Sequence, residues 1–359
     1  MKETTTALNY PRISHVHKAL PEHTRNTAEI LPFVRLWLEG QDERFIRKVV
    51  KVFEGAGVDK RYGIMSIEEV FQATSFQDKN KLYEAAAKEL GENCLRGALK
   101  ESGWTEKSID MVITVSCTGI MIPSLDAYLI NALDLRRDVK RLPVTEMGCA
   151  AGVSGIIYAT HYLKANPGKR VALVAVECPT ATFQHGDFSM ANMVSAALFG
   201  DGAACVLLSS KDEDKGPEIK GEGMYHFYEA THLMGFDLTN TGLQMILDPE
   251  VPSMIESHFM DLLVPFLKEN GSDLNRLKHL VFHPGGRKIV QTVEDLFGGL
   301  GKNIDDTREV LRQFGNMSSV TVLYVLERFL NREVPAGDQG LLLSFGPGFS
   351  AQRVLIEWK

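Results

Sequence analysis

The stretch VTEMGCAAGVSG, residues 144–155, joins a strand-forming run to a helical pattern through Gly-Cys-Ala-Ala-Gly. Cys149 therefore lies just before a helix that the pattern predicts from about residue 153 to residue 164. Because unpaired N–H groups and the helix dipole favour an anion at a helix N-terminus, this position is expected to lower the pKa of the thiol. The small neighbours leave room for a substrate. A nucleophile and a buried core cysteine at a tight turn both fit this stretch.

Helix and strand signals alternate along the rest of the chain, which indicates an α/β fold. The segment 80–103 is rich in Ala, Leu, Glu and Lys and predicts a helix that ends near Gly103. Short, mostly apolar and β-branched runs at 110–117, 170–177 and 203–210 predict buried strands.

The two halves of the chain are similar to each other. LFGDGAACVLL at 198–208 and SFGPGFSAQRVLIEW at 344–358 are both Phe-Gly-x-Gly turns followed by a strand, and each comes after a long helical stretch. The charged segment 209–218 has no periodicity and predicts a linker. These features predict two copies of one αβ unit, with an N-terminal half at 1–212 and a C-terminal half at 213–359.

Composition limits the classes of function. The chain has 359 residues, 44% of them hydrophobic, and a formal net charge of −7. This charge argues against nucleic acid as the main partner, because binding to a phosphate backbone needs a basic surface. The N-terminal sequence has no apolar signal core, and no apolar run approaches the roughly 18 residues of a membrane span. We therefore expect a soluble, cytoplasmic protein without an integral membrane segment.

The five cysteines are widely scattered, and no C-x-x-C pair is present. Their odd number argues against a disulfide framework, and their spacing predicts no zinc site. Most of them are expected to be ordinary buried thiols.

Two further stretches place a polar residue beside small residues at the end of an element. HLVFHPGGRKIV at 279–290 predicts a strand ending at His283, and FGNMSSVTVLYVLERFL at 314–330 puts Asn316 before a helix. A satisfied histidine and a helix N-cap explain each residue alone. Together with Cys149 they form a Cys-His-Asn set, in which imidazole and amide N–H groups can stabilise an oxyanion during thiol acyl transfer.

The chain resembles the type III polyketide synthases, the chalcone-synthase-like family of condensing enzymes. Five motifs carry the resemblance in family order: MGCAAG around Cys149, ALFGDGAA at 197–204, HPGG at 283–286, GNMSS at 315–319 and FGPG at 345–348. SCTGIMIPSLDAYLIN at 116–131 is similar to the bacterial branch. The resemblance implies a thiolase-like fold of duplicated αβαβα halves and a homodimeric acyltransferase that uses acyl-CoA and malonyl-CoA. It implies no metal and no cofactor beyond these thioesters.

The resemblance also implies roles for individual residues. Cys149 matches the acyl-carrying nucleophile, and His283 and Asn316 match the oxyanion site that promotes decarboxylation of malonyl-CoA. Phe199 matches a gatekeeper between pocket and tunnel, and Met245 stands where plant enzymes have a second phenylalanine gatekeeper. The other matched pocket positions are Thr182, Ser195, Ser318, Cys117, Pro347 and Gly348.

The starter substrate is predicted from the second gatekeeper. Met245 is flexible and suits irregular apolar ligands, and MGFDLTNTGLQMILDPEVP at 234–252 resembles alkylpyrone and alkylresorcinol synthases. We therefore expect fatty acyl starters and pyrone or resorcinol products. Cys117 coincides with a cysteine of bacterial synthases that are primed by malonyl-CoA, so a phloroglucinol or tetrahydroxynaphthalene type of synthase stays open. A loop residue that contacts the partner subunit in plant enzymes aligns with Met121 or Ile122.

Coenzyme A carries several phosphates, and a basic segment could meet them. RFIRKVVKVF at 44–53 predicts a helix with basic residues on one face. We expect Lys48, Lys51 and Arg61 to contact the phosphates, although a solvated charged face explains each residue equally well.

Three other functions are compatible with parts of the sequence. An initiating ketoacyl-carrier-protein synthase shares the Cys-His-Asn set, but this class has a PHQAN-like segment where this chain has HPGGRK. A papain-like protease has the same order of residues but lacks support from a signal peptide or disulfide pattern. A catalytically silent acyl-CoA-binding paralogue would not need all three reactive residues.

Overall fold

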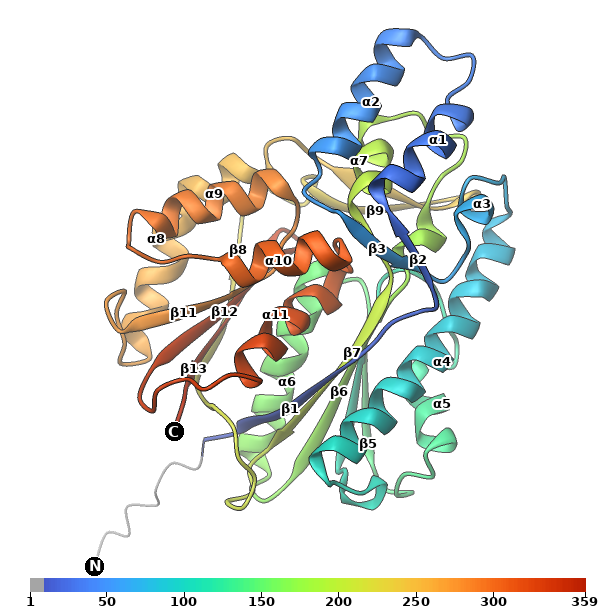
Figure 1. The fold of residues 1–359 in the computed structure, drawn as a ribbon. Helices are drawn as coiled ribbons and strands as arrows, with labels where there is room; N and C mark the ends of the chain where they lie inside the picture. The colour runs from blue at the N-terminus through green and yellow to red at the C-terminus, as the bar shows by residue number, and fades with distance from the viewer. Residues whose placement is uncertain (1–9) are drawn as a thin grey trace, which may run out of the picture.

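A nine-stranded sheet forms the centre of the molecule (Figure 1). The computed structural model describes residues 10–359. The strands of the sheet are β1 (Arg12–Ala19), β4 (Met111–Val115), β5 (Lys140–Val144), β6 (Arg170–Glu177), β7 (Gly202–Ser209), β8 (Glu218–His226), β11 (Leu277–Phe282), β12 (Gln339–Gly346) and β13 (Ser350–Glu357). Their spatial order is β11-β12-β13-β8-β1-β7-β6-β4-β5.

The sheet contains one strand pattern twice. In the first repeat, β1 pairs antiparallel with β7, β7 antiparallel with β6, and β6 parallel with β4. In the second repeat, β8 pairs antiparallel with β13, β13 antiparallel with β12, and β12 parallel with β11. The repeats meet where Arg12 of β1 lies opposite Glu218 of β8. This repetition confirms the predicted duplicated α/β fold, and β5 extends the first repeat by one strand.

Two buried helices connect the repeats. The helix α6 (Ala151–Ala165) contacts β4 and β6 of the first repeat and β12 and β13 of the second. The helix α11 (Thr321–Leu330) contacts β1 and β7 as well as β11 and β12. The short helical turns before them, η2 (Gly148–Ala150) and η4 (Ser318–Val320), also contact each other. A Cβ at Gly152 would lie 2.2 Å from the Ser319 carbonyl oxygen, so this close approach requires glycine.

Other helices cover the outer faces. The helix α4 (Phe76–Ser102) packs on β1, β6 and β7 and ends at Gly103, whose φ is 72°. The helix α5 (Leu125–Ala132) packs on β4 and β5. On the side of the second repeat lie α8 (Val251–Glu269), α9 (Arg287–Gly298) and α10 (Asp305–Phe314) (Figure 1). The helix predicted at 80–103 is confirmed, as are the three predicted strands, within a few residues at their ends.

A smaller group of elements lies beside the carboxyl ends of the central strands and completes the site. It contains α1 (Thr27–Trp37), α2 (Glu43–Gly55), α3 (Ile67–Val70), the turn η3 (Pro179–Thr182) and α7 (Met190–Leu198). It also contains two antiparallel pairs, β2 (His23–Asn26) with β3 (Lys60–Gly63) and β9 (Met234–Thr239) with β10 (Gly242–Leu247). A short turn, η1 (Glu106–Ser108), precedes β4.

The predicted linker joins the two repeats between Ser209 and Glu218. It is held in place by Asp214, which accepts hydrogen bonds from Arg170 at 2.7 and 2.8 Å. The division of the chain at residue 212 stays a prediction. Within residues 10–359, no helix is both long and apolar enough to cross a membrane.

The loop between β4 and α5 exposes apolar side chains. Ile122 is 94% exposed and Ile120 is 44% exposed. Ile122 is therefore the better of the two alternatives for the partner-contacting position, because Met121 is packed against the core cluster around α4.

Candidate active site

Cys149 lies at a sharp turn between β5 and α6. Gly148 has φ of 51°, and a Cβ there would lie 2.7 Å from Cδ of Pro347, so glycine is needed both for the turn and for the contact. Cys149 is 9% exposed and faces a cavity of about 50 Å³. The loop after β12 thus closes one side of the cysteine turn.

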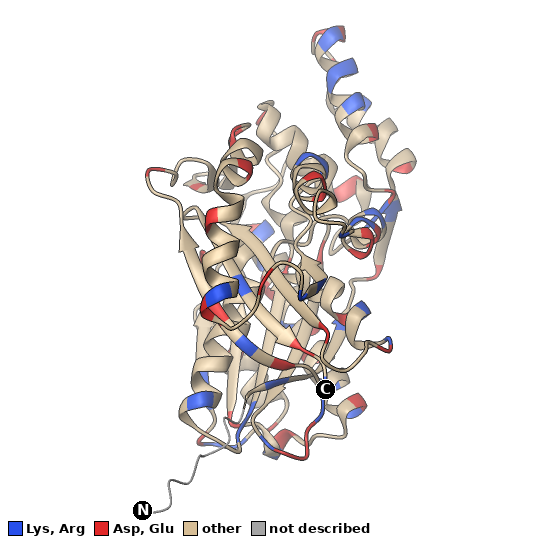
Figure 2. Cartoon of the chain, turned by 90° about the vertical axis from the view of Figure 1, so that its left-hand side faces the viewer, with Lys and Arg blue, Asp and Glu red and all other residues tan. Residues whose placement is uncertain are grey.

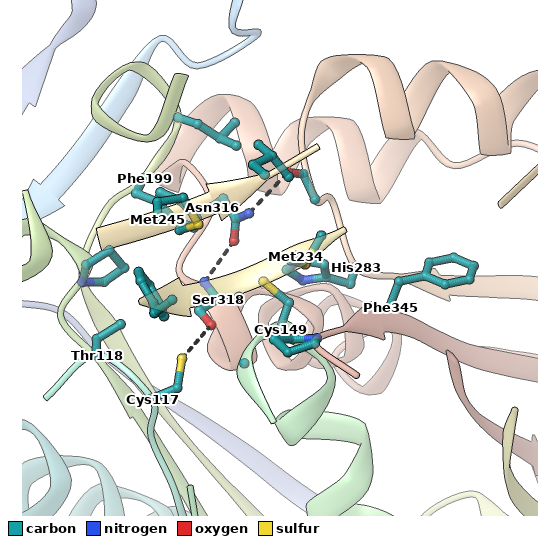
Figure 3. A pocket seen from close by; sticks show the side chains of 18 of the residues that line it. Cys117, Thr118, Cys149, Phe199, Met234, Met245, His283, Asn316, Ser318 and Phe345 are labelled. Carbon is teal, nitrogen blue, oxygen red and sulfur yellow. Dashed lines mark hydrogen bonds between the residues drawn. The ribbon is translucent and has the colours of Figure 1, made fainter. Parts of the chain in front are cut away.

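His283 and Asn316 line the same cavity as Cys149 (Figure 3). His283 directly follows β11 and is 2% exposed. Asn316 follows α10 and is 1% exposed. Its Oδ1 accepts a hydrogen bond from the Ser318 amide at 2.8 Å, while its Nδ2 donates to the Gly285 carbonyl at 3.3 Å. The fold therefore brings together three residues that are far apart in sequence.

Burial opposes charge on both reactive side chains. Burial raises the pKa of Cys149 to about 12, although hydrogen bonds from Ser318 and Asn316 act in the opposite direction. Burial also lowers the pKa of His283 to about 3. The expected lowering of the thiol pKa by the helix N-terminus is therefore wrong, because loss of hydration in the cavity outweighs the helix dipole. Near pH 7 the two residues form a neutral thiol and a neutral imidazole.

A buried carboxylate lies close to the site. Glu177 at the end of β6 is fully buried, and its charge contributes to the raised pKa of Cys149. It accepts hydrogen bonds from Ser319 Oγ at 2.6 Å, Thr118 Oγ1 at 2.9 Å and the Cys117 amide at 3.0 Å. Burial raises the pKa of Glu177 in spite of these donors. Burial favours the neutral form of the acid, whereas the donors of this network favour the charged form.

The structure places most predicted pocket residues in the cavity wall. Phe199, Met245, Cys117, Ser318 and Pro347 all line the cavity. Ser318 has φ of 48°, and its Oγ lies 3.5 Å from the Cys117 sulfur (Figure 3).

Three predicted pocket residues do not line this cavity. Thr182 is 7% exposed and donates its hydroxyl to the Pro179 carbonyl at 2.8 Å. Ser195 lines a neighbouring cavity together with Phe199. Gly348 lies in the turn before β13, where its φ of 121° requires glycine. Thr182 and Gly348 lie in turns and Ser195 lies on α7, so none of the three forms the wall of the catalytic cavity.

Several wall residues were missed by the sequence reasoning. The pair β9–β10 supplies one wall, where Met245 lies opposite Phe236 in register. The alternating apolar residues of this pair could have indicated a strand with one face toward a ligand. Met234 and Leu247 belong to this pair, and Phe345 lies near the end of β12. The other missed residues have no local signal, because they come from turns and helix ends: Thr118, Pro179, Leu198 and Ile289.

A larger cavity of about 420 Å³ adjoins the first and shares Leu198, Leu247, Gly285 and Ile289 with it. Three cations line this outer cavity: Lys51, Arg287 and Lys288. Lys48 is exposed on the same helix as Lys51 but does not line it. Basic residues follow one another along the projecting helix α2 (Figure 2). Arg287 and Lys288 were missed, although they directly follow the HPGG motif.

Arg61 is placed differently from the expectation. Its side chain is 2% exposed and donates hydrogen bonds to Thr27 Oγ1 at 2.8 Å and to the Ala196 carbonyl at 3.3 Å. Burial and the neighbouring charge of Arg25 lower its pKa to about 9. The prediction that Arg61 contacts a coenzyme A phosphate is wrong, because its guanidinium lies in the interior and not at the outer cavity.

Two histidines that have no companion motif in the sequence share a partner in the structure. His15 Nε2 and His17 Nδ1 lie 3.0 and 2.9 Å from the same Glu101 oxygen. Their ligand atoms lie within 4.8 Å of one another, so this group could hold a metal ion. The prediction of no metal stays a prediction.

Comparison with known proteins places the chain in a family. The family profile "Chalcone and stilbene synthases, N-terminal domain" matches residues 15–212. The profile "Chalcone and stilbene synthases, C-terminal domain" matches residues 226–358. Together the two profiles cover nearly the whole chain.

Bacterial relatives are similar over almost their full length. A 1,3,6,8-tetrahydroxynaphthalene synthase of Streptomyces peucetius subsp. caesius is 34% identical, over 96% of this chain and 93% of the relative. A phloroglucinol synthase of Pseudomonas fluorescens is 32% identical, over 84% of this chain and 86% of the relative.

The fold agrees with these matches. The crystal structure of 1,3,6,8-tetrahydroxynaphthalene synthase from Streptomyces coelicolor A3(2), a bacterial type III polyketide synthase, superimposes with a TM-score of 0.91. It is 30% identical, and the match covers 97% of this chain and 99% of that one. Members of this family are condensing acyltransferases that use coenzyme A thioesters. The chain belongs to the chalcone and stilbene synthase family and is a bacterial type III polyketide synthase.

Proposed function

We propose that this enzyme is primed by malonyl-CoA, extends the chain with further malonyl-CoA and releases a polyhydroxylated aromatic product. One observation carries the choice of starter: the cavity beside Cys149 measures about 50 Å³. A water-sized group needs roughly 10–15 Å³ by this measure, so the cavity has room for about four such groups. The part of a malonyl group beyond its thioester carbon, a methylene and a carboxylate, matches this size, whereas a long alkyl chain exceeds it.

The chemistry starts with acyl transfer to Cys149. The thiol gives its proton to His283 as the sulfur attacks the thioester carbonyl, and the proton leaves with the coenzyme A thiol. Because both residues are neutral at rest, proton transfer accompanies attack and no standing ion pair is needed.

Extension requires an enolate. Loss of carbon dioxide from malonyl-CoA leaves negative charge on the thioester oxygen, where Asn316 Nδ2 and an N–H of His283 can donate hydrogen bonds. The enolate carbon then attacks the thioester on Cys149, and the Cys149 sulfur is the leaving group. The extended chain is now a coenzyme A thioester and can return to Cys149 for another cycle.

Other parts of the proposal concern binding and assembly. Lys51, Arg287 and Lys288 around the outer cavity are suited to the phosphates of coenzyme A, with Lys48 next to them. We further propose a homodimer in the cytoplasm that needs no metal and no cofactor beyond its thioester substrates.

A second candidate is the fatty acyl starter expected from the sequence. The observation in its favour is the wall formed by Met234 and Met245, because methionine side chains adapt to ligands of different shape. Hexanoyl, decanoyl and longer starters would need this wall to move.

Mass spectrometry of the products tests the two candidates. The enzyme is incubated with malonyl-CoA alone and with malonyl-CoA plus acyl-CoAs of increasing length. Product from malonyl-CoA alone, made faster than any alkyl-primed product, supports the proposal. Alkylpyrones or alkylresorcinols as main products, with no product from malonyl-CoA alone, would contradict it.

A further inference from the structure

A third cavity, of about 40 Å³, adjoins the catalytic cavity. Phe199 and Pro179 line both cavities, so these two residues form part of the wall between them. Two arginines, Arg25 from β2 and Arg61 from β3, form part of its wall. A cavity with two arginines next to a catalytic site needs a physical explanation.

Both guanidinium groups are buried and incompletely bonded. Arg25 is 6% exposed and Arg61 is 2% exposed. Arg25 Nη2 and Arg61 Nε have no hydrogen-bond partner among residues 10–359. Burying a cationic donor without a partner raises the free energy of the folded state, because the group loses its hydration and forms no hydrogen bond in its place.

The nearby acid Asp201 already accepts hydrogen bonds from other groups. Asp201 is fully buried and influences Arg25 through its charge. Its oxygens accept hydrogen bonds from the Ile64 amide at 2.8 Å and the Thr180 amide at 2.9 Å. Exposed Glu68 also acts on Arg25 through its charge. Neither acid forms a hydrogen bond with the two unpartnered nitrogens.

The size and chemistry of the cavity fit one kind of ligand group. Guanidinium groups bind planar anions in a fork, and a carboxylate is the smallest such anion in acyl chemistry. A volume of about 40 Å³ has room for about three water-sized groups, which is the size of a carboxylate.

We propose that Arg25 and Arg61 form a subsite for the free carboxylate at the starter end of a dicarboxylic acyl chain. This inference rests on the proposed function, in which a malonyl starter keeps its carboxylate. Each extension inserts two carbons next to the thioester, so the starter end moves away from Cys149 as the chain grows. Displacement of the Phe199 ring lets the carboxylate reach the two arginines, which fixes the far end of the intermediate.

A matched pair of starters tests the subsite. Succinyl-CoA and butyryl-CoA both have four acyl carbons, and they differ in having a terminal carboxylate or a methyl group. With both starters present in equal amounts together with malonyl-CoA, mass spectrometry gives the ratio of succinyl-primed to butyryl-primed products. The wild-type enzyme should favour succinyl, and Arg25→Met should lower the ratio about ten- to a hundredfold, as expected for the loss of a hydrogen bond to a charged group.

Two further variants separate recognition from folding. Arg25→Lys keeps the charge without the fork and should give an intermediate ratio. Arg353→Met removes another buried arginine, 8% exposed, which lines none of the three cavities, and it should keep the wild-type ratio. If Arg25→Met does not fold, the subsite is tested by two other results. These are the preference of the wild-type enzyme for succinyl-CoA over butyryl-CoA and the product ratio of Arg25→Lys.

The outcomes distinguish the subsite from the proposed function. A wild-type enzyme without preference for succinyl, or a folded Arg25→Met enzyme with an unchanged ratio, overturns the subsite. If malonyl-CoA alone gives product in either of these cases, the proposed function survives without the subsite. If malonyl-CoA alone gives no product but the ratio depends on Arg25, the subsite stands and the malonyl starter is wrong.

Discussion

Cys149 and His283 meet in a cavity that disfavours charge on either side chain. The pKa of the thiol is raised to about 12 and that of the imidazole is lowered to about 3, in both cases by burial. The resting enzyme therefore holds no preformed thiolate near pH 7. A neutral cysteine is less prone to react with oxidants and electrophiles before a substrate arrives, since the thiolate is the nucleophile.

Alkylation of Cys149 should therefore increase steeply with pH. Between pH 7 and pH 10 the fraction of thiolate rises about tenfold per pH unit as long as the pH stays below the pKa of about 12. Brief iodoacetamide treatment at several pH values, followed by peptide mapping, measures this. A rate that is level from pH 6 to pH 8 would show a thiolate–imidazolium pair and contradict the neutral pair.

Selectivity among the cysteines provides a control for this experiment. Cys149 should be labelled before the fully buried Cys94, Cys178 and Cys205, because these three do not line the catalytic cavity. Cys117 lines the cavity, but burial and the charge of Glu177 raise its pKa well above the usual value. Faster labelling of Cys117 than of Cys149 would contradict the assignment of the nucleophile.

We expect Asn316 to serve decarboxylation more than acyl loading. Asn316→Ala removes one neutral donor from the developing oxyanion, which typically lowers a rate by about 10²–10³. Release of carbon dioxide from malonyl-CoA should fall by this factor, while intact-protein mass spectrometry still detects acyl-Cys149. Cys149→Ala provides the converse control and should keep carbon dioxide release without product. Wild-type decarboxylation by Asn316→Ala would mean that the side chain only orders the turn through Ser318.

At this scale the sequence predicts which residues meet, but it does not predict their protonation. Cys149, His283 and Asn316 were found because each follows an element end and lies beside small residues. The raised pKa of Cys149 was not found, because it depends on how much water the closed wall excludes. The prediction that Arg61 contacts a phosphate failed for the same reason. The sequence shows a cation next to a basic helix, but it does not show that the side chain is surrounded by the protein interior.

The helix α6 passes close to the turn η4. Gly152 on α6 leaves no room for a side chain, since its Cβ would lie 2.2 Å from the Ser319 carbonyl oxygen. Cys149 precedes α6, and Asn316 precedes η4. The spacing between these two backbones therefore sets the spacing between Cys149 and Asn316.

Gly152→Ala should destabilise the protein and lower activity together. The new methyl group must push the two segments apart, and overpacking of this kind costs about 1–3 kcal/mol. Urea unfolding and the rate of product formation measure the two effects. Gly298→Ala is a suitable control, because Gly298 ends α9 with no atom within 4 Å of the added methyl group. Wild-type stability of Gly152→Ala would show that the contact is looser than described.

The order and type of the elements follow from the sequence better than their contacts do. The strands at 170–177 and 203–210 were predicted almost to the residue, because their runs are continuous and apolar. The wall formed by β9 and β10 was not predicted as a wall, because a half-exposed strand pair gives a weak signal. Its role depends on contacts with segments that are distant in sequence, because β10 packs against α7 and η3.

For the whole molecule, His283 links activity to acid stability. Its pKa is about 3 in the folded chain, whereas the unfolded value is about 6.5. Below pH 6.5 the unfolded chain takes up a proton that the folded chain refuses, so stability is full above pH 6.5 and falls as the pH falls towards 3.

His283→Gln should therefore flatten the dependence of stability on pH. Urea unfolding at intervals between pH 7 and pH 4 should show a smaller loss of unfolding free energy for this variant than for the wild type. His279→Gln is the matched control, because His279 lies four residues earlier and is only partly buried. An unchanged slope for His283→Gln would show that other groups govern the acid limit.

The exposed Ile122 has a consequence for how the enzyme responds to dilution. Full burial of a side chain that is 94% exposed contributes roughly 1.5–3 kcal/mol of stabilising free energy. A second subunit can provide that burial. Mass action then couples folding to association. Specific activity should fall below a threshold concentration, and Ile122→Asp should raise this threshold about tenfold or more, measured by activity against analytical ultracentrifugation. The abundance of the protein in the cell would then determine how much of it is active.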